Sequence, residues 1–525
     1  MLFVLRTMKK SLFAGLTLMV LLVAACRKES DHVMSYAFND YMAFERADTS
    51  FAGKFDVFWH GLNANYAMWD IEKSYGLDWD EWYDMYYPKF EELDNQEAEV
   101  TDDQLRALMQ EMVYPLHDGH LAVQFNNHDT DNFLMVSPGG IRAYTERKDE
   151  YLFSYSFKPS LDYYRERGDL LEYKTYDTNT LNVVLPALLE YLAGEIAVLE
   201  EKEELTADEQ AKLDLFEKIN TEVLAAQTKL VDDKDEEEAY KLYNEAALRY
   251  EYLNIPGFAE ADDTLIEYPL KITYALFKGN IAYLRIDRFL LSAFLMPEWV
   301  EELFDTPSEA AQASIDEVVS TWTAWFQAIQ THHKKGDLGG VVLDVRSNGG
   351  GYMYDFQFVL GALVPSGGMH VMNARFKRGP GRYDFSPVMP QYMYTYKEEH
   401  VTVTEPIVVL CNCYSVSMSE QTAIGAGLLD NGVLIGTRTW GGFSALSGAE
   451  SYSNNYAGHV GVKDETPVYC YIPGELAITL DGKVLEGEGL TPDIVVPFDE
   501  VSWNDGAGPD NQLDRALQYC LHFEK

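Results

Sequence analysis

Gly339-Gly-Val-Val-Leu-Asp-Val-Arg-Ser-Asn-Gly-Gly-Gly351 is the stretch that decides how this chain folds. Its apolar run Val341-Val-Leu-Asp-Val345 predicts a buried strand, and the glycines after it predict a loop. Because glycine has no side chain to block access, the backbone N–H groups of such a loop can approach a substrate carbonyl. A tight turn that merely needs positive φ is the alternative explanation for these glycines.

A second stretch, Cys411-Asn-Cys-Tyr-Ser-Val-Ser417-Met-Ser-Glu420, follows the strand-like run Pro406 to Leu410. A serine at a strand-to-helix turn can project its hydroxyl into a cleft. Acyl transfer needs a positioned nucleophile and hydrogen-bond donors for the oxyanion. The two stretches together therefore predict an acyl-transfer site, with an ordinary turn serine as the alternative for Ser417.

Strands and helices alternate from about residue 268 onward. This βαβ rhythm predicts an α/β core with a largely parallel sheet. Ligands in such sheets bind at the carboxyl ends of the strands, where both stretches emerge. The predicted strands are Leu270–Leu276, Asn280–Ile286, Val341–Val345, Ile407–Leu410 and Val433–Gly436, and the predicted helices are Ser314–His332, Tyr354–Leu363 and Glu420–Leu429.

Four ordered motifs resemble those of the tail-specific (C-terminal-processing) and tricorn-type serine peptidases. Asp344 to Gly351 resembles the family's Asp-(Leu/Val)-Arg-x-Asn-x-Gly-Gly loop, and Ser415 to Glu420 resembles its Ser-x-Ser-x-Ser-Glu turn. The run Glu486 to Val496 is similar to its Glu-x-x-Gly-(Val/Leu)-x-Pro-Asp-(Ile/Val) signature. Gly279 to Phe289 resembles the strand that opens its catalytic core. Each motif alone is weak, but four in order are specific.

The resemblance covers most of residues 36–125 and 268–500. It implies a crotonase-like βαβ sheet with an N-terminal helical domain, to which this chain adds a helical insertion. It also implies serine peptidase activity with Ser417 as the nucleophile, without a metal or cofactor. The implied oxyanion donors are the backbone N–H groups of Met418 and of Gly349 or Gly350.

The general base separates two branches of the resembled family. The tail-specific branch uses a lysine from a Thr-Phe-Gly-Lys-Gly loop, but Gly442 stands at that position here. The tricorn-like branch uses a Ser–His–Glu set, which implies His120 as the base and Glu486 as its orienting carboxylate. A neutral imidazole can take the serine proton near physiological pH. His117 is an alternative base, and Asp118 and Glu420 are alternative carboxylates.

The length of 525 residues exceeds what one hydrophobic core supports, so several domains are expected. Aromatic residues at helical spacings predict a helical N-terminal domain, and Thr101 opens a helix with a capping box. Tyr151-Leu-Phe-Ser-Tyr155 is strand-like. The predicted divisions are 1–25 (lipoprotein signal peptide), 26–35 (tether), 36–125 (helical domain carrying the histidine), 126–267 (middle region) and 268–525 (catalytic α/β core).

The middle region contains an acidic helical stretch over residues 183–252. Its pattern predicts two long amphipathic helices packed as a hairpin, with a capping box at Thr206-Ala-Asp-Glu209. Many tail-specific peptidases carry a PDZ module here, but no Gly-Leu-Gly-Phe-like loop is present in this sequence. The hairpin is therefore expected to act as a lid or partner arm, or as a spacer.

The N-terminus predicts where in the cell the protein is located. Lys9 and Lys10 precede the apolar run Leu12 to Ala25, which is too short to span a bilayer and ends at Cys26. Leu22-Val-Ala-Ala-Cys26 resembles a bacterial lipobox. We therefore expect a protein of the bacterial cell envelope that is anchored by lipid on Cys26. The expected membrane is the outer membrane, with the protein on its periplasmic face or on the cell surface. A cleaved soluble secretory signal is the alternative.

Charge and cysteine usage restrict the possible partners. The formal net charge of −44 argues against binding nucleic acid or anionic lipid surfaces. The spacing of Cys411, Cys413, Cys470 and Cys520 fits neither a zinc site nor a disulfide framework.

The expected function is that of a lipid-anchored serine endopeptidase that cleaves unfolded or terminal polypeptide segments through an acyl-enzyme. One alternative is a catalytically inactive relative that binds peptides or other ligands. Another is a surface adaptor in which the helical hairpin recruits other envelope proteins. The sequence does not predict the oligomeric state.

Overall fold

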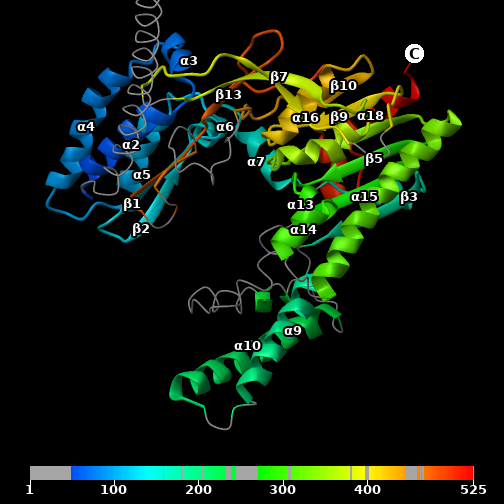
Figure 1. Cartoon of the computed structure of the whole chain (residues 1–525), viewed down its shortest axis with the longest axis horizontal. Coiled ribbons are helices and arrows are strands. Elements are labelled where there is room, and N and C mark those ends of the chain that lie inside the picture. Colours follow the sequence, from blue (N-terminus) through cyan, green and yellow to red (C-terminus); the bar gives the residue numbers. More distant parts are fainter. Residues whose placement is uncertain are drawn as a thin grey trace, which may run out of the picture. The chain divides into compact units, whose positions relative to one another are not determined.

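The computed structural model divides the chain into two compact units, and each unit draws on separated segments (Figure 1). The first comprises Met1–Leu152, Met372–Gln391 and Trp440–Gly489, and the second comprises Phe153–Val371, Tyr392–Thr439 and Leu490–Lys525. Sequence analysis, in contrast, divides the chain into consecutive blocks. The structure describes residues 49–157, 159–178, 181–200, 202, 205–231, 238–239, 241–243, 270–304, 309–378, 381–396, 401–444, 458–461, 463 and 466–523.

The first unit begins with a group of capped helices, and the capping box predicted at Thr101 is confirmed. Thr101 and Gln104 form the capping box of α5, with each side chain accepting the other's backbone N–H. Ser50 and Asp78 likewise accept backbone N–H groups at the starts of α2 and α4. The helices are α2 (Phe51–Asn65), α3 (Trp69–Ser74), α4 (Trp79–Asn95), α5 (Asp102–Val113) and α6 (Pro138–Glu146).

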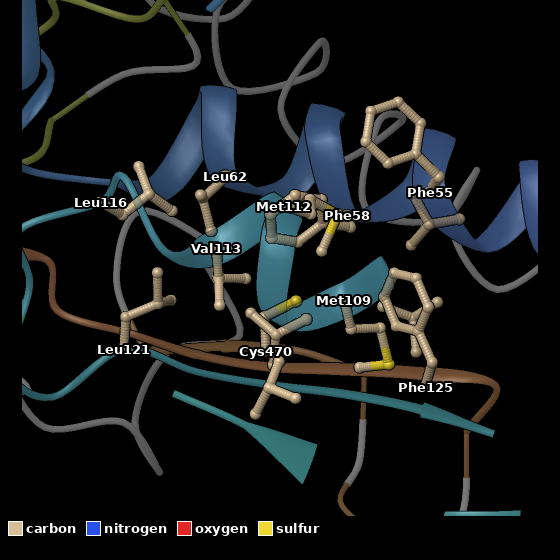
Figure 2. Close-up of a cluster of buried hydrophobic side chains, with 14 of the residues drawn as sticks. Phe55, Phe58, Leu62, Met109, Met112, Val113, Leu116, Leu121, Phe125 and Cys470 are labelled. Carbon is tan, nitrogen blue, oxygen red and sulfur yellow. The ribbon is translucent and has the colours of Figure 1, made fainter. Parts of the chain in front are cut away.

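These helices pack on an antiparallel sheet with the strand order β11-β12-β1-β2. The strands are β11 (Gly458–Val460), β12 (Val468–Ile472), β1 (Ala122–Asn127) and β2 (Asn132–Val136). Figure 2 shows Phe58 of α2 and Met109 of α5 above Phe125 and Cys470 of the sheet. The aromatic residues at helical spacing are therefore core residues.

A smaller sheet has the order β13-β7-β8, with strands β13 (Glu475–Ile478), β7 (Met369–Phe376) and β8 (Met389–Met393). β13 pairs antiparallel with β7, from Glu475 opposite Phe376 to Ile478 opposite Asn373. Segments about a hundred residues apart in the sequence thus complete the first unit.

The second unit is built on a seven-stranded sheet with the order β14-β10-β9-β6-β5-β4-β3. The strands from β14 to β5 run parallel, whereas β4 and β3 are antiparallel additions. The α/β core is therefore confirmed, and the sheet is mixed at one end. The strands are β14 (Ile494–Val495), β10 (Gly432–Gly436), β9 (Ile407–Cys411), β6 (Gly340–Asp344), β5 (Ile281–Ile286), β4 (Lys271–Phe277) and β3 (Leu170–Asp177).

Helices pack against this sheet through its apolar side chains. Leu513 and Ala516 of α18 belong to the same buried cluster as Val342 and Val408 of the central strands. α15 contacts β3, β4 and β5, and α16 contacts β9 and β10. The helices of this unit are α8 (Asp162–Glu166), α13 (Ser292–Leu295), α14 (Pro297–Phe304), α15 (Glu309–Lys335), α16 (Met418–Gly427), α17 (Glu500–Trp503) and α18 (Asn511–Leu521), with a 3₁₀ turn at Asn504–Gly506.

Two secondary-structure predictions are wrong. The segment predicted as a helix over Tyr354–Leu363 is two 3₁₀ turns, η1 (Met353–Phe358) and η2 (Leu360–Ala362). The strand-like run Tyr151–Tyr155 lies in a helix, α7 (Lys148–Ser156). Phe153 stacks on Phe498 and lies tilted against Phe157, which meets Phe498 edge-on. This packing overrides the strand preference of aromatic residues.

The predicted helical hairpin is confirmed between β3 and β4. It consists of α9 (Leu181–Glu200) and α10 (Ala207–Val231), which share a core that includes Leu192 and Phe216. Thr206 and Glu209 form the capping box at its turn. None of the helices in the described ranges has the length and apolarity needed to cross a bilayer. The predicted signal peptide and Cys26 lie outside the described residues.

Candidate active site

Two loops of the second unit emerge at the same edge of its sheet. β6 and β9 are parallel neighbours, with Asp344 opposite Leu410. The glycine loop follows β6 and the serine turn follows β9, so both lie at carboxyl ends of strands, as the sequence predicts.

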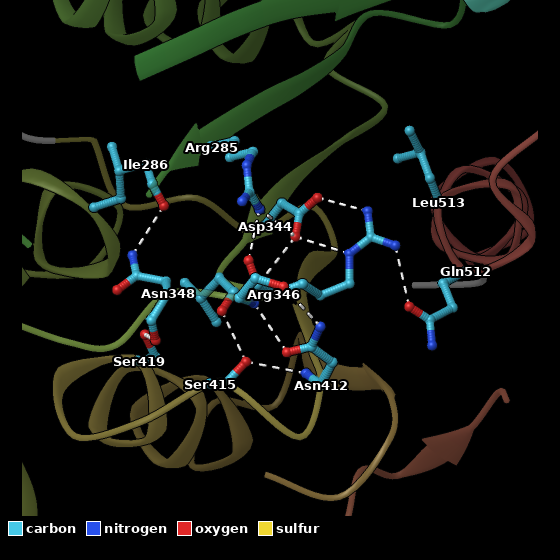
Figure 3. Close-up of polar contacts among 12 residues, drawn as sticks. Arg285, Ile286, Asp344, Arg346, Asn348, Asn412, Ser415, Ser419, Gln512 and Leu513 are labelled. Carbon is cyan, nitrogen blue, oxygen red and sulfur yellow. Dashed lines mark hydrogen bonds and ion pairs between the residues drawn. The ribbon is translucent and has the colours of Figure 1, made fainter. Parts of the chain in front are cut away.

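Asn348 joins these two loops. Its carbonyl oxygen accepts the N–H of Val416 at 3.0 Å and the hydroxyl of Ser419 at 2.7 Å. Its side-chain amide donates to the Ile286 carbonyl at 2.8 Å, which ties the loop to β5 (Figure 3). Asn348 therefore fixes the glycine loop against the serine turn, a role that the sequence analysis missed.

A buried ion-pair network lies where β6 ends (Figure 3). Arg346 donates to Asp344 through Nε at 2.9 Å and through Nη2 at 2.6 Å, and its Nη2 also lies 2.7 Å from Asp510. Tyr283 donates to the same Asp344 carboxylate at 2.8 Å. Burial raises the pKa of Asp344, but Arg346, Arg285 and Tyr283 together bring it below its ordinary value, so Asp344 stays ionised. This network holds the base of the glycine loop rigid.

The serine turn has its own polar bracing. Asn412 accepts the N–H groups of Ser347 at 2.9 Å and Tyr414 at 3.0 Å. Ser415 Oγ donates to the Val345 carbonyl at 2.7 Å and accepts the Asn412 N–H at 3.0 Å. The turn that presents Ser417 is thus hydrogen-bonded to the end of β6 on both sides.

Ser417 lies at the N-terminus of α16 with φ 57° and ψ −116°, a conformation that side-chain-bearing residues rarely adopt. Its backbone N–H donates to Glu420 Oε2 at 3.1 Å, and Thr439 Oγ1 donates to Glu420 Oε1 at 2.5 Å. Glu420 therefore holds the strained turn. Strain of this kind, stabilised by its surroundings, is typical of functional sites.

Two backbone N–H groups beside Ser417 are suited to bind an oxyanion. Those of Gly349 and Met418 have no hydrogen-bond partner among the described residues. The Gly350 N–H donates to Asn348 Oδ1 at 2.8 Å, so Gly350 is wrong as a donor. Gly350 instead lets the loop approach the turn, since a Cβ on it would lie 2.6 Å from Ser417 Cβ.

His120 lies in the first unit, on the loop between α5 and β1. Asp118 Oδ1 accepts the backbone N–H groups of His120 and Leu121, each at 2.7 Å. Gly119 packs so closely on Gly441 that a Cβ there would lie 2.3 Å from the Gly441 carbonyl oxygen. Trp440 Nε1 donates to the Gly119 carbonyl at 2.9 Å. The histidine loop is therefore braced by the segment that resembles the lysine-bearing loop.

Glu486 is buried in the same unit and accepts three backbone N–H groups. Its Oε1 accepts from Gly119 at 2.8 Å, and its Oε2 accepts from Phe443 at 2.8 Å and Ser444 at 2.6 Å. His120 Nδ1 is buried and has no hydrogen-bond partner among the described residues. The expectation that Glu486 bonds to the imidazole directly is therefore wrong, because its oxygens hold the backbone of two loops.

Burial lowers the pKa of His120 to about 4, so the imidazole is neutral at physiological pH. His117, the alternative base, has a different environment. Its Nδ1 lies 2.9 Å from Glu72 Oε2, and its ring stacks on Tyr75 with centroids 3.9 Å apart. His117 is thus a paired structural histidine, whereas His120 is the one with an unengaged imidazole.

The cysteines offer no competing nucleophile among the described residues. Cys411, Cys413, Cys470 and Cys520 are buried thiols. Burial raises the pKa of the Cys411 and Cys470 thiols well above the ordinary value, which disfavours the reactive thiolate. Within the described part of the chain, no group of His, Cys, Asp and Glu residues is placed to hold a metal ion.

The sequence of the core matches a family model. Residues 280–496 match the model of peptidase family S41. These residues form an S41 serine peptidase domain. The S41 domain contains the glycine loop, the serine turn and Glu486.

One curated relative is the Tricorn protease of Thermoplasma volcanium, which is 26% identical over 183 residues. The match covers 35% of this chain but only 15% of the length of that relative. Among solved structures, mature CPAF in complex with lactacystin is similar with a TM-score of 0.45 and 13% identity, covering 90% of this chain and 98% of that one. The photosystem II D1 C-terminal processing protease gives a TM-score of 0.26 and 20% identity, covering 41% and 42%.

Proposed function

We propose that this protein is a serine endopeptidase whose nucleophile is Ser417. The observation that carries the proposal is the strained turn of Ser417, held by Glu420 and flanked by the unpaired N–H groups of Gly349 and Met418. A positioned hydroxyl next to unpaired donors is what acyl transfer requires. The S41 domain supports the same chemistry.

In the proposed reaction, Ser417 Oγ attacks the scissile carbonyl carbon while His120 takes the hydroxyl proton. The N–H groups of Gly349 and Met418 stabilise the oxyanion that forms. Collapse of this intermediate breaks the C–N bond, and the leaving amine takes the proton from the imidazolium. Water, deprotonated by His120, then hydrolyses the acyl-enzyme and restores Ser417. This reaction requires that the imidazole of His120 reach Ser417 Oγ.

Glu486 has a positioning role in this proposal. It fixes the backbone of Gly119, next to His120, together with that of Phe443 and Ser444. A carboxylate that accepts several N–H groups is a strong anchor, because each bond to the charged group is stronger than a neutral one. Polypeptide is the substrate implied by the S41 domain, and we propose unfolded or terminal segments as its targets.

A fluorophosphonate probe tests the nucleophile and the base together. We expect an adduct on Ser417, located by mass spectrometry, that is absent from Ser417→Ala and strongly reduced in His120→Ala. Since burial lowers the pKa of His120 to about 4, the labelling rate should be constant from pH 8 to about pH 5 and half-maximal near pH 4.

His117→Ala is the matched control, because His117 is paired with Glu72 three residues from His120. It should label like the wild type. A midpoint near pH 6.5 would show that the imidazole is solvated, and undiminished labelling of His120→Ala would show that another group is the base. The absence of any adduct on folded protein would favour the catalytically inactive relative.

We also propose that the protein is anchored to a bacterial envelope by lipid on Cys26, as the lipobox-like run before that residue suggests. Diacylation gives stable membrane attachment, whereas a single chain does not. Cells expressing the wild type should incorporate labelled palmitate into the protein and retain it in the membrane fraction. Cys26→Ser should lose both label and membrane retention, and a labelled Cys26→Ser protein would contradict the assignment.

A further inference from the structure

A row of aromatic side chains begins two residues after Gly350, within the second unit. It consists of Tyr352, Trp299, Tyr354 and Tyr394, which we call the aromatic row. The ring of Trp299 lies 4.8 Å from that of Tyr352 and 5.5 Å from that of Tyr354, both edge-on. Tyr354 stacks on Tyr394 with centroids 5.0 Å apart. The rings are therefore continuous from the glycine loop outward.

The aromatic row is partly open to solvent, although aromatic side chains usually bury most of their surface. Tyr354 is 40% exposed and Tyr394 is 47% exposed. Neighbouring aromatics normally pack into a core, as they do in the cluster of the first unit. Contiguous exposed apolar side chains mark a binding surface more often than a single exposed residue does.

The backbone that carries the aromatic row is rigid. Gly351 bridges to Phe289, whose carbonyl accepts the Tyr352 N–H at 2.8 Å. The buried Asp355 accepts the N–H groups of Leu291 at 2.5 Å and Ser292 at 2.7 Å. A Cβ on Gly361 would lie 2.7 Å from the Tyr394 carbonyl oxygen, so Tyr394 packs closely on η2. The backbone of Tyr352, Tyr354 and Tyr394 is thus braced before any ligand binds, which lowers the entropic cost of binding.

The aromatic row also starts close to the nucleophile. Gly350 touches the Ser417 turn, and two residues of chain reach at most about 7 Å from Gly350 to Tyr352. An extended substrate rises about 3.3 Å per residue, so a chain that followed the row from Ser417 would bring residues about two to six positions from the scissile bond beside the rings. The four side chains carry no charge, which favours a planar apolar side chain over a carboxylate.

We propose that the aromatic row is a substrate subsite that selects polypeptide segments carrying an aromatic side chain two to six residues from the cleaved bond. This inference rests on the proposed function, because it takes the occupant to be the substrate of Ser417. Stacking on exposed rings would supply the selectivity, and an extended backbone would place the scissile carbonyl beside Gly349 and Met418.

Paired quenched peptides that differ only in Phe or Ser at these positions test the subsite. The wild type should prefer the best Phe peptide by about tenfold in kcat/KM. The double variant Tyr354→Ser, Tyr394→Ser should lose this preference, with the loss of kcat/KM falling on the Phe peptide. Tyr383→Ser is the matched control, because Tyr383 is 49% exposed and lies outside the aromatic row; it should keep the preference.

Binding separates this inference from the proposed function. Fluorescence anisotropy with the Ser417→Ala protein measures peptide Kd without turnover, and the Phe peptide should bind about tenfold more tightly than the Ser peptide unless the two tyrosines are replaced. Equal Kd values for the two peptides, together with probe labelling of Ser417 in the wild type, would overturn the subsite but not the proposed peptidase activity. Selective binding without any Ser417 labelling would support the subsite and overturn the peptidase.

Discussion

Replacing Gly350 with alanine is expected to lower kcat/KM at least about a hundredfold without unfolding the protein. The added Cβ would lie 2.6 Å from Ser417 Cβ, 2.9 Å from the Val416 carbonyl oxygen and 3.1 Å from the Met418 nitrogen. All three atoms belong to the rigid turn, so the turn must shift. A displacement of about 1 Å at a reacting group can cost about a hundredfold in rate. Hydrolysis of a fluorogenic peptide and a thermal melt measure the two effects.

Gly367→Ala is the control for backbone strain. Gly367 has φ +116°, comparable with the +95° of Gly350, but an added Cβ there meets nothing within 4 Å. Both substitutions strain the backbone, whereas only that at Gly350 displaces the nucleophile. Gly367→Ala should therefore lose some stability and keep its activity. A Gly350→Ala protein within threefold of the wild type would show that the glycine loop does not press against Ser417.

Arg346→Leu is expected to destabilise the second unit by about 3 to 5 kcal/mol, because it leaves buried carboxylates without their partner. Arg346 is fully buried and is bonded to Asp344 and Asp510. Urea unfolding followed by fluorescence measures the loss. Arg165→Leu is the matched control, since its pair with Asp162 is 54% and 56% exposed. It should change the free energy of unfolding by less than about 1 kcal/mol.

The effect of Arg346→Leu should also depend on pH. In the wild type, burial raises the pKa of Asp344. The lowering by Arg346, Arg285 and Tyr283 is larger in total, so this pKa lies below its ordinary value. The stability it contributes is present above about pH 4 and is lost as pH falls through the lower folded pKa. In the variant, Asp344 keeps Arg285 and Tyr283 but loses Arg346, so burial raises its folded pKa and ionised Asp344 contributes less to stability. The difference between the two proteins should shrink from pH 7 to pH 3.5, and a constant difference would show that Asp344 is not the cause.

Much of the fold could be predicted, since its strands are apolar runs that only a buried sheet accommodates. Ile407–Leu410 and Val341–Val345 are two such cases, found as β9 and β6. α7 is predicted wrongly because its aromatic residues also fit the pattern of a strand. Phe153 and Phe157 stand four residues apart, on one helical face, and that spacing was the available signal.

Part of the candidate site could likewise be predicted from the sequence, and part could not. Ser417 and its glycine loop could be predicted, because a strand that ends in a characteristic turn is a local property. The environment of Glu486 could not, since Gly119 lies 367 positions away in the sequence. Nor does any spacing tell which N–H groups are already engaged, so the sequence does not distinguish Gly349 from Gly350, whose N–H donates to Asn348.

The interleaving of the two units has a consequence for how the protein is made. In the first unit, Ala122 of β1 pairs with Tyr471 of β12, and Gly119 is held by Glu486. Closing such long loops is entropically costly and slow, and it cannot begin before the C-terminal partner has been synthesised. A nascent or prematurely terminated chain therefore lacks the support that holds the histidine loop. If His120 is the base, as proposed, proteolytic competence would arise only after the C-terminal segment has been made.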